Sequence, residues 1–115
     1  MADGVVELKQ EIMGDVLVLR INGRLDTISS PAAERQVFEF INNGRHKVLF
    51  DCAGVDYLSS AGMRMLLSTA KKLKSLSGKM VICNITTAVL EVLKMSGFDH
   101  VLDITKTEDE ALRKF

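Results

Sequence analysis

One segment indicates the fold class, because it leads from a buried strand into an amphipathic helix: Phe50-Asp51-Cys52-Ala53-Gly54-Val55-Asp56-Tyr57-Leu58-Ser59-Ser60-Ala61-Gly62. Residues 47–52 form a short, nearly continuous apolar run, which is typical of a strand covered on both faces. We expect a short loop after this strand. Ser59 and Ser60 would then project from the end of a central strand, at the start of the helix.

The helix predicted after this segment has two different faces. Its apolar stripe consists of Met63, Leu66, Leu67, Ala70 and Leu73. Met65 is expected to lie off this stripe. The basic residues that fall largely off it are Arg64, Lys71, Lys72 and Lys74. The helix should therefore bury one face and expose a basic, solvated one.

The N-terminal part predicts a β-hairpin followed by a helix. Residues 5–12 and 16–21 read as two strands, and Gly14-Asp15 suits the tight turn between them. In the helix that follows, Ser30 is the expected cap and Pro31 fits the first turn. This helix should end near Asn43-Gly44.

The C-terminal part predicts further alternation of strands and helices. Residues 79–85 resemble a second central strand, and residues 87–96 a helix that ends at Gly97. Val101–Ile104 offers a short edge strand, and Thr107–Glu110 fits a capping box that opens a last helix. The pattern predicts an α/β fold with a mixed central sheet and helices packed mainly on one face.

Composition limits the classes of partner. The 115 residues are 47% hydrophobic, enough for one core, so we expect a single domain over residues 1–115. The 15 basic and 15 acidic side chains cancel, and no basic stripe is interleaved with aromatics, which argues against nucleic acid. No apolar run approaches the length that spans a bilayer, and Met1-Ala2-Asp3-Gly4 lacks a basic leader region. We expect a cytoplasmic protein that does not insert into membranes.

Residues able to carry catalysis or bind metal are few. Cys52 and Cys83 lie in apolar stretches without Cys-x-x-Cys spacing, which indicates two reduced core residues. His46 and His100 lack the partners of a metal or catalytic site. The residue two before Ser60 is Leu58, so there is no Gly-x-Ser-x-Gly motif, and the chain has no phosphate-binding loop. We therefore expect a binding protein with no cofactor and no metal, not an enzyme.

Four motifs together resemble the STAS domain, in particular the bacterial anti-sigma-factor antagonists. They occur in this order along almost the whole chain: Gly23-Arg24-Leu25-Asp26, Phe50-Asp51 through Tyr57-Leu58-Ser59-Ser60-Ala61-Gly62, Gly78-Lys79-Met80, and Leu93-Lys94-Met95-Ser96-Gly97. The resemblance implies a protein that binds an anti-sigma factor with serine-kinase activity and so frees a sigma factor. It also implies that phosphorylation of one serine ends this binding and that a serine phosphatase reverses it.

The matching serine is Ser60, with Ser59 as the second choice, because Ser59 stands where several family members carry Asp. Asp26 matches an acidic residue near the phosphorylated serine, and Asp56 is close in sequence, so the phosphate would face carboxylates. Neutral Ser60, with Leu58, Met63 and the exposed helix face, is expected to contact the kinase. The expected partner-binding set is Asp26, Asp56, Leu58, Ser59, Ser60, Gly62, Met63 and Arg64.

Other interpretations fit the same residues. A serine at the start of a helix usually serves as its N-cap, and an aspartate such as Asp26 usually serves in a turn or cap. A STAS domain also fits an adaptor subunit of a membrane lipid-transport complex or of a signalling scaffold. Copurification with a soluble serine kinase or with a transporter ATPase would distinguish these two roles.

Overall fold

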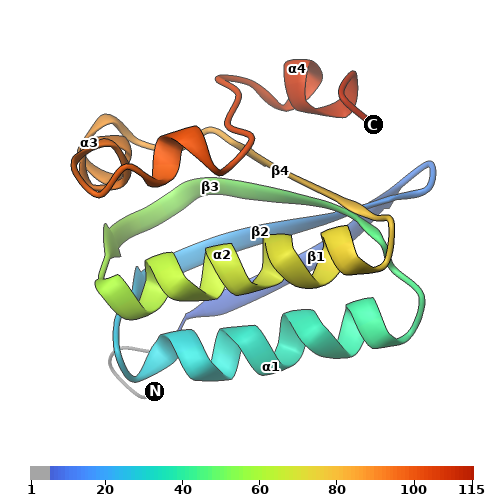
Figure 1. Ribbon diagram of the computed structural model, residues 1–115, viewed down its shortest axis with the longest axis horizontal. Coiled ribbons are helices and arrows are strands. Elements are labelled where there is room, and N and C mark those ends of the chain that lie inside the picture. Colours follow the sequence, from blue (N-terminus) through green and yellow to red (C-terminus); the bar gives the residue numbers. More distant parts are fainter. Residues whose placement is uncertain (1–5) are drawn as a thin grey trace.

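The computed structural model describes residues 6–115, in which a four-stranded mixed sheet is covered by helices (Figure 1). The strands are β1 (Glu7–Met13), β2 (Val16–Leu25), β3 (Lys47–Leu58) and β4 (Lys79–Cys83). They lie in the order β1-β2-β3-β4, with β1 antiparallel to β2 and the other pairs parallel. The predicted mixed sheet and N-terminal hairpin are confirmed. Val5, the expected first residue of the hairpin, lies outside the described residues.

The two central strands are longer than predicted. β2 continues from Ile21 to Leu25, and β3 continues through Asp56 to Leu58, so the loop expected before Ser59 is wrong. The two strands stay paired there through two register irregularities. Gly54 permits this close pairing, because a Cβ at this position would lie 2.9 Å from the Ile21 carbonyl oxygen and 1.8 Å from Oδ1 of the Asn22 side chain.

β4 was expected to be central but lies at the end of the strand order. Among residues 6–115, its outer side carries only an isolated parallel bridge, between Ile82 and Ile104, so the edge strand expected at 101–104 shrinks to one residue. The Ile82 amide donates to the Asp103 carbonyl and the Thr105 amide donates to the Ile82 carbonyl, each at 2.8 Å. These bonds satisfy the outward backbone groups of Ile82. The strand is apolar because Met80 and Ile82 pack in the larger core on one face, while Val81 and Cys83 pack with Ala111 of α4 on the other.

The helices pack mainly on one face of the sheet, as predicted. α1 (Ser29–Asn42), α2 (Ser60–Ser75) and α3 (Thr87–Met95) contribute side chains to the larger hydrophobic core. A 3-10 turn, η1 (Phe98–His100), follows α3. α4 (Glu108–Leu112) covers the other face, where Ala111 joins a small core of Val16, Val18, Leu49, Val81 and Cys83. The expected cap of α4 is confirmed, because the Glu110 amide donates to Thr107 Oγ1.

Two expectations about α1 and α2 are wrong. Ser30 does not cap α1, because Asp26, three residues before the first residue of α1, takes that role. The Asp26 carbonyl accepts from the Ser30 amide at 3.0 Å, and Asp26 Oδ1 accepts from the amides of Ile28 and Ser29 at 3.0 and 2.8 Å. The helix therefore begins earlier and leaves Ser30 buried. Met65 is buried rather than off the stripe, being 2% exposed. α1 packs beside α2 and covers a flank of α2 that the sheet alone would leave open.

Candidate functional site

The start of α2 is tied to the end of β2 by Ser59. Both the amide and the hydroxyl of Ser59 donate to the Leu25 carbonyl at 2.9 Å. Ser59 Oγ also accepts from the Gly62 amide at 3.2 Å, so Ser59 is the N-cap of α2. The cap interpretation is therefore confirmed for Ser59, whose hydroxyl is engaged as both donor and acceptor.

Ser60 differs from Ser59 in both exposure and bonding. It is the first residue of α2 and is exposed. Within residues 6–115, no side-chain hydrogen bond involves the Ser60 hydroxyl. An exposed hydroxyl at a helix N-terminus is accessible to another protein, and the helix dipole there favours an added negative charge.

The remaining residues expected at this turn divide into packing and surface positions. Leu58 is only 4% exposed and Gly62 is buried, so neither offers a contact surface. A Cβ on Gly62 would lie 2.7 Å from Leu58 Cδ1 and 2.8 Å from the Leu25 carbonyl oxygen. Met63 is half-buried against the core, whereas Arg64 is exposed. Leu58 and Gly62 thus position the turn.

Two carboxylates lie at the same end of the sheet as Ser60. Asp26 follows Leu25, which Ser59 binds, and Asp56 is exposed near the end of β3. The hydrogen bond from the Ser29 amide is the largest cause of a pKa of Asp26 below its ordinary value. Desolvation opposes this shift, and the hydrogen bond from the Ile28 amide adds to it. Asp26 is therefore charged at neutral pH while it caps α1, which agrees with the cap interpretation of this residue.

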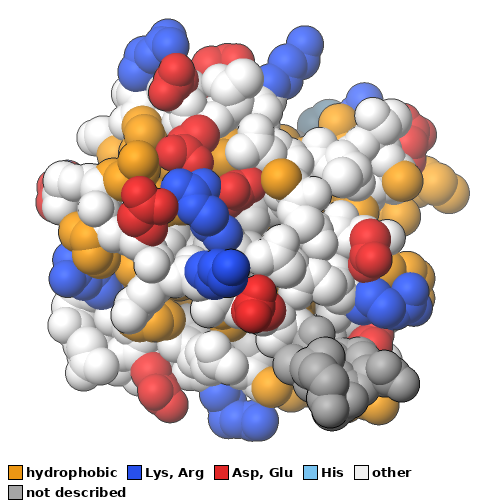
Figure 2. Space-filling model, turned by 180° about the vertical axis from the view of Figure 1, so that it is seen from behind, with side chains coloured by type: hydrophobic (Ala, Val, Ile, Leu, Met, Phe, Trp, Pro, Cys, Tyr) orange, Lys and Arg blue, Asp and Glu red, His pale blue; other side chains and the backbone are white. Residues whose placement is uncertain are grey.

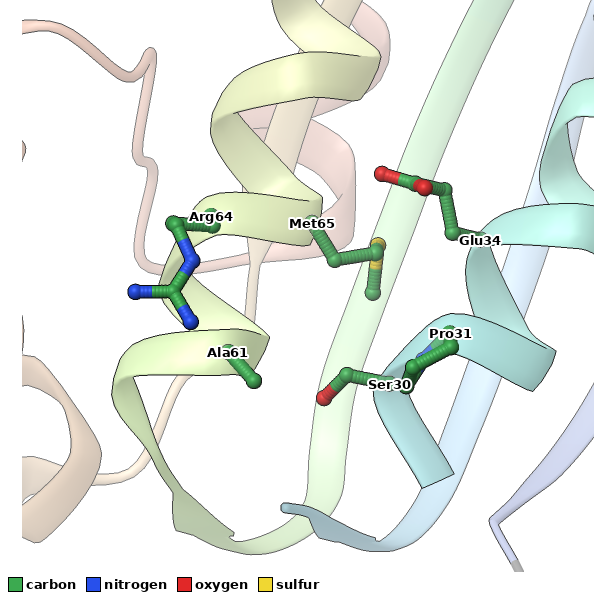
Figure 3. A pocket seen from close by; sticks show the side chains of 6 residues that line it. All are labelled: Ser30, Pro31, Glu34, Ala61, Arg64 and Met65. Carbon is green, nitrogen blue, oxygen red and sulfur yellow. The ribbon is translucent and has the colours of Figure 1, made fainter. Parts of the chain in front are cut away.

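A hollow of about 230 Å³ separates the first turns of α1 and α2 (Figure 3). Ser30, Pro31 and Glu34 line it from α1, and Ala61, Arg64 and Met65 line it from α2. The Ser30 hydroxyl points between the helices and has no hydrogen-bond partner among residues 6–115. Sequence reasoning missed this hollow, because only the side-by-side packing of the two helices creates it.

The opposite face of the sheet carries a charged cluster that the sequence did not reveal (Figure 2). Arg20 forms ion pairs with Glu108, Asp51 and Glu11 at 2.7, 2.8 and 2.9 Å. Burial raises the pKa of Asp51, but hydrogen bonds from the Ala53 amide and Asn84, together with Arg20, outweigh burial and leave the pKa below its ordinary value. The cluster joins α4 to three strands, so its role is structural.

The described residues also bear on other chemistry. Both cysteines are free and buried, and burial raises the pKa of Cys83 to about 12. Residues 6–115 contain no group of three or more His, Cys, Asp or Glu side chains arranged to hold a metal ion. In the same range, no helix has the length and apolarity needed to cross a membrane.

These features define an α/β domain whose candidate site is an exposed polar turn at the end of a parallel strand pair. The STAS domain model matches residues 7–111, and the chain therefore belongs to the STAS domain family. The expected family and fold are confirmed.

Known relatives of similar length match over most of this chain. BtrV of Bordetella bronchiseptica, a candidate anti-sigma factor antagonist, is 26% identical over 110 residues, which are 96% of this chain and 95% of that protein. The anti-sigma F factor antagonist of Paenibacillus polymyxa is 25% identical over 108 residues, 93% and 92% of the two chains. The crystal structure of an anti-sigma factor antagonist from Mycobacterium paratuberculosis has the same fold, with a TM-score of 0.88 at 22% identity, covering 98% of this chain and 96% of that one.

Proposed function

We propose that this chain is an anti-sigma-factor antagonist of the bacterial cytoplasm, which binds an anti-sigma factor with serine-kinase activity and is switched off by phosphorylation of Ser60. The names of the relatives support the general role. The contrast between the two serines supports the choice of site, because the Ser59 hydroxyl is engaged as the cap of α2 while Ser60 is exposed and its hydroxyl has no hydrogen bond among the described residues. In this role the chain is the substrate of its partner and works by binding.

The proposed contact surface surrounds the first turn of α2. Ser60 and Arg64 are exposed and four residues apart, so they share one face of the helix. Asp26 and Asp56 lie at the same end of the sheet. Leu58 and Gly62 serve this surface indirectly, by holding α2 against the ends of β2 and β3.

A phosphate on Ser60 would act through charge. It adds about two negative charges at neutral pH, close to the carboxylates of Asp26 and Asp56. The N-terminal end of α2 tolerates this charge in the free protein, so the fold need not change. Arg64 lies one turn away on the same face of α2, but a phosphate dianion that is desolvated in the complex and meets no cation of the partner still costs several kcal/mol. Each ~1.4 kcal/mol weakens binding tenfold, so this change is large enough to release the partner.

The partner supplies the nucleotide site and Mg²⁺ for phosphoryl transfer, and a separate serine phosphatase returns the chain to its binding form. Mass spectrometry of the protein from its native source, before and after phosphatase treatment, tests the resting state. A phosphate on Ser60 that the phosphatase removes supports the proposal.

Binding tests the switch itself. Ser60→Asp should weaken binding of the cognate kinase at least about tenfold, while Ser60→Ala should bind like the wild type. Equal binding by Ser60→Asp would contradict a switch based on charge. Copurification with a transporter ATPase in place of a soluble kinase would favour the adaptor role instead.

A further inference from the structure

We propose that β1 is a self-association edge, through which two copies of this chain pair antiparallel about Gln10. β1 is the first strand of the sheet, and within residues 6–115 no other strand pairs with its outer side. An unpaired strand edge presents backbone donors and acceptors to another strand. A second copy of β1 is the occupant that its sequence fits.

The register follows from the strand itself. β1 comprises the seven residues Glu7–Met13, and Gln10 is the middle one. Pairing two copies about Gln10 therefore uses the whole length of both strands. This register places Lys9 opposite Glu11 of the second copy, and Leu8 opposite Ile12, each twice because the pair is symmetric.

Charge complementarity favours this register. Within its own chain Lys9 lies directly opposite Arg20, a residue of like charge, and residues 6–115 offer Lys9 no ion pair. Arg20 donates both of its hydrogen bonds with Glu11 to Oε1, so Oε2 of Glu11 is left for a second cation. Opposite charges directly across an antiparallel pair are favourable, so the second copy would give Lys9 its carboxylate.

Apolar contacts agree with the charges. Ile12 is 46% exposed, although it belongs to a strand whose Leu8 packs against the main core. Both residues lie on the face that α1 and α2 cover, because they pair with the core residues Leu17 and Ile21 of β2. In the proposed dimer, Leu8 of each copy lies opposite Ile12 of the other and extends that core.

A cysteine at the symmetry axis tests the register directly. Antiparallel partners have Cα atoms about 4.5–5.5 Å apart, within the range that a disulfide spans. Gln10→Cys should therefore cross-link two chains under mild oxidation, whereas Glu7→Cys should not, since two copies of residue 7 would lie about 20 Å apart. The native cysteines are buried and give little background. Absence of the Gln10→Cys cross-link, or equal cross-linking by Glu7→Cys, would overturn the proposal.

Sedimentation of the full chain at rising concentration tests the charges. An edge of this size should give a weak dimer, with a dissociation constant on the order of 100 μM. Lys9→Glu should weaken it about tenfold or more, and adding Glu11→Lys should restore it, because the swap recreates both pairs and places the new carboxylate opposite Arg20. Lys71→Glu on α2 is the matched control. A monomer at about 1 mM, or a dimer insensitive to Lys9→Glu, would refute the edge. Neither assay involves the kinase, so this proposal and the Ser60 switch fail separately.

Discussion

Gly62→Ala tests whether α2 lies as close to the strand ends as the site requires. The added Cβ would lie 2.7 Å from Leu58 Cδ1, 2.8 Å from the Leu25 carbonyl oxygen and 2.9 Å from Leu25 Cβ. The end of the Leu58 side chain can shift. The carbonyl cannot shift without loss, because it accepts both hydrogen bonds from Ser59.

Two effects of opposite sign decide the outcome. Alanine is favoured over glycine in a helix by about 1 kcal/mol, while overpacking of a close contact costs about 1–3 kcal/mol and the loss of a cap about 0.5–2 kcal/mol. We expect a net loss of about 1–2 kcal/mol in the free energy of unfolding, measured by urea denaturation followed by circular dichroism. Ser60→Ala, on the exposed side of the same turn, should change it by less than about 0.5 kcal/mol. A Gly62→Ala protein more stable than the wild type would refute the close approach of α2.

Three further predictions concern the rest of the fold. The pKa of Asp51 is depressed in the folded chain, so the Asp51 carboxylate stabilises the fold above its unfolded pKa of about 3.9, and this effect is lost as pH falls through the folded pKa. In urea titrations, the free energy of unfolding should therefore decline less steeply below about pH 5 for Asp51→Asn than for the wild type. Asp26→Asn keeps the accepting oxygen and should melt like the wild type, whereas Asp26→Ala should lose about 0.5–2 kcal/mol, and equal losses would contradict the capping role. Cys83 should resist a thiol reagent at pH 8 because it is buried under α4 and its pKa is raised to about 12. Ala111→Asp should loosen α4 and make Cys83 reactive, while Cys52 stays protected. A reactive Cys83 in the wild type would contradict its packing under α4.

Local signals in the sequence predicted the ends of several elements correctly. Gly14-Asp15 forms the two-residue hairpin turn, Gly97 takes the left-handed conformation after α3, and Thr107 caps α4. Each of these depends on the conformational preference of a few neighbouring residues. Such preferences are read from sequence because no distant contact has to be known.

The sequence-based predictions are wrong where contacts with a distant segment determine the structure. β3 extends to Leu58 because β2 extends beside it, and Met65 is buried because α1 packs against α2. The apolar run of residues 79–85 indicates burial, but it cannot show that the strand ends at Cys83 or that a bridge from Ile104 covers the outer side of β4. Spacing within one segment carries no information about which neighbour covers it.

The candidate site shows the same division. The sequence places two serines at a helix start, and resemblance alone favours Ser60 over Ser59. The choice gains a physical basis only when Leu25, distant in sequence, is seen to accept both hydrogen bonds from Ser59. The hollow between α1 and α2 and the ion pairs of Arg20 also join distant segments, so sequence patterns could not indicate them.

In the proposed switch, Ser60 accepts the phosphate while Ser59 caps the helix. The most direct test incubates the purified chain with its cognate serine-kinase anti-sigma factor, ATP and Mg²⁺, and follows phosphate incorporation by intact mass and peptide mapping. We predict one phosphate on Ser60 in the wild type and none in Ser60→Ala. Ser59→Ala should still be phosphorylated on Ser60, although it loses about 0.5–2 kcal/mol of stability with its cap. Phosphate incorporation into Ser60→Ala at the wild-type rate would show that Ser60 is not the acceptor.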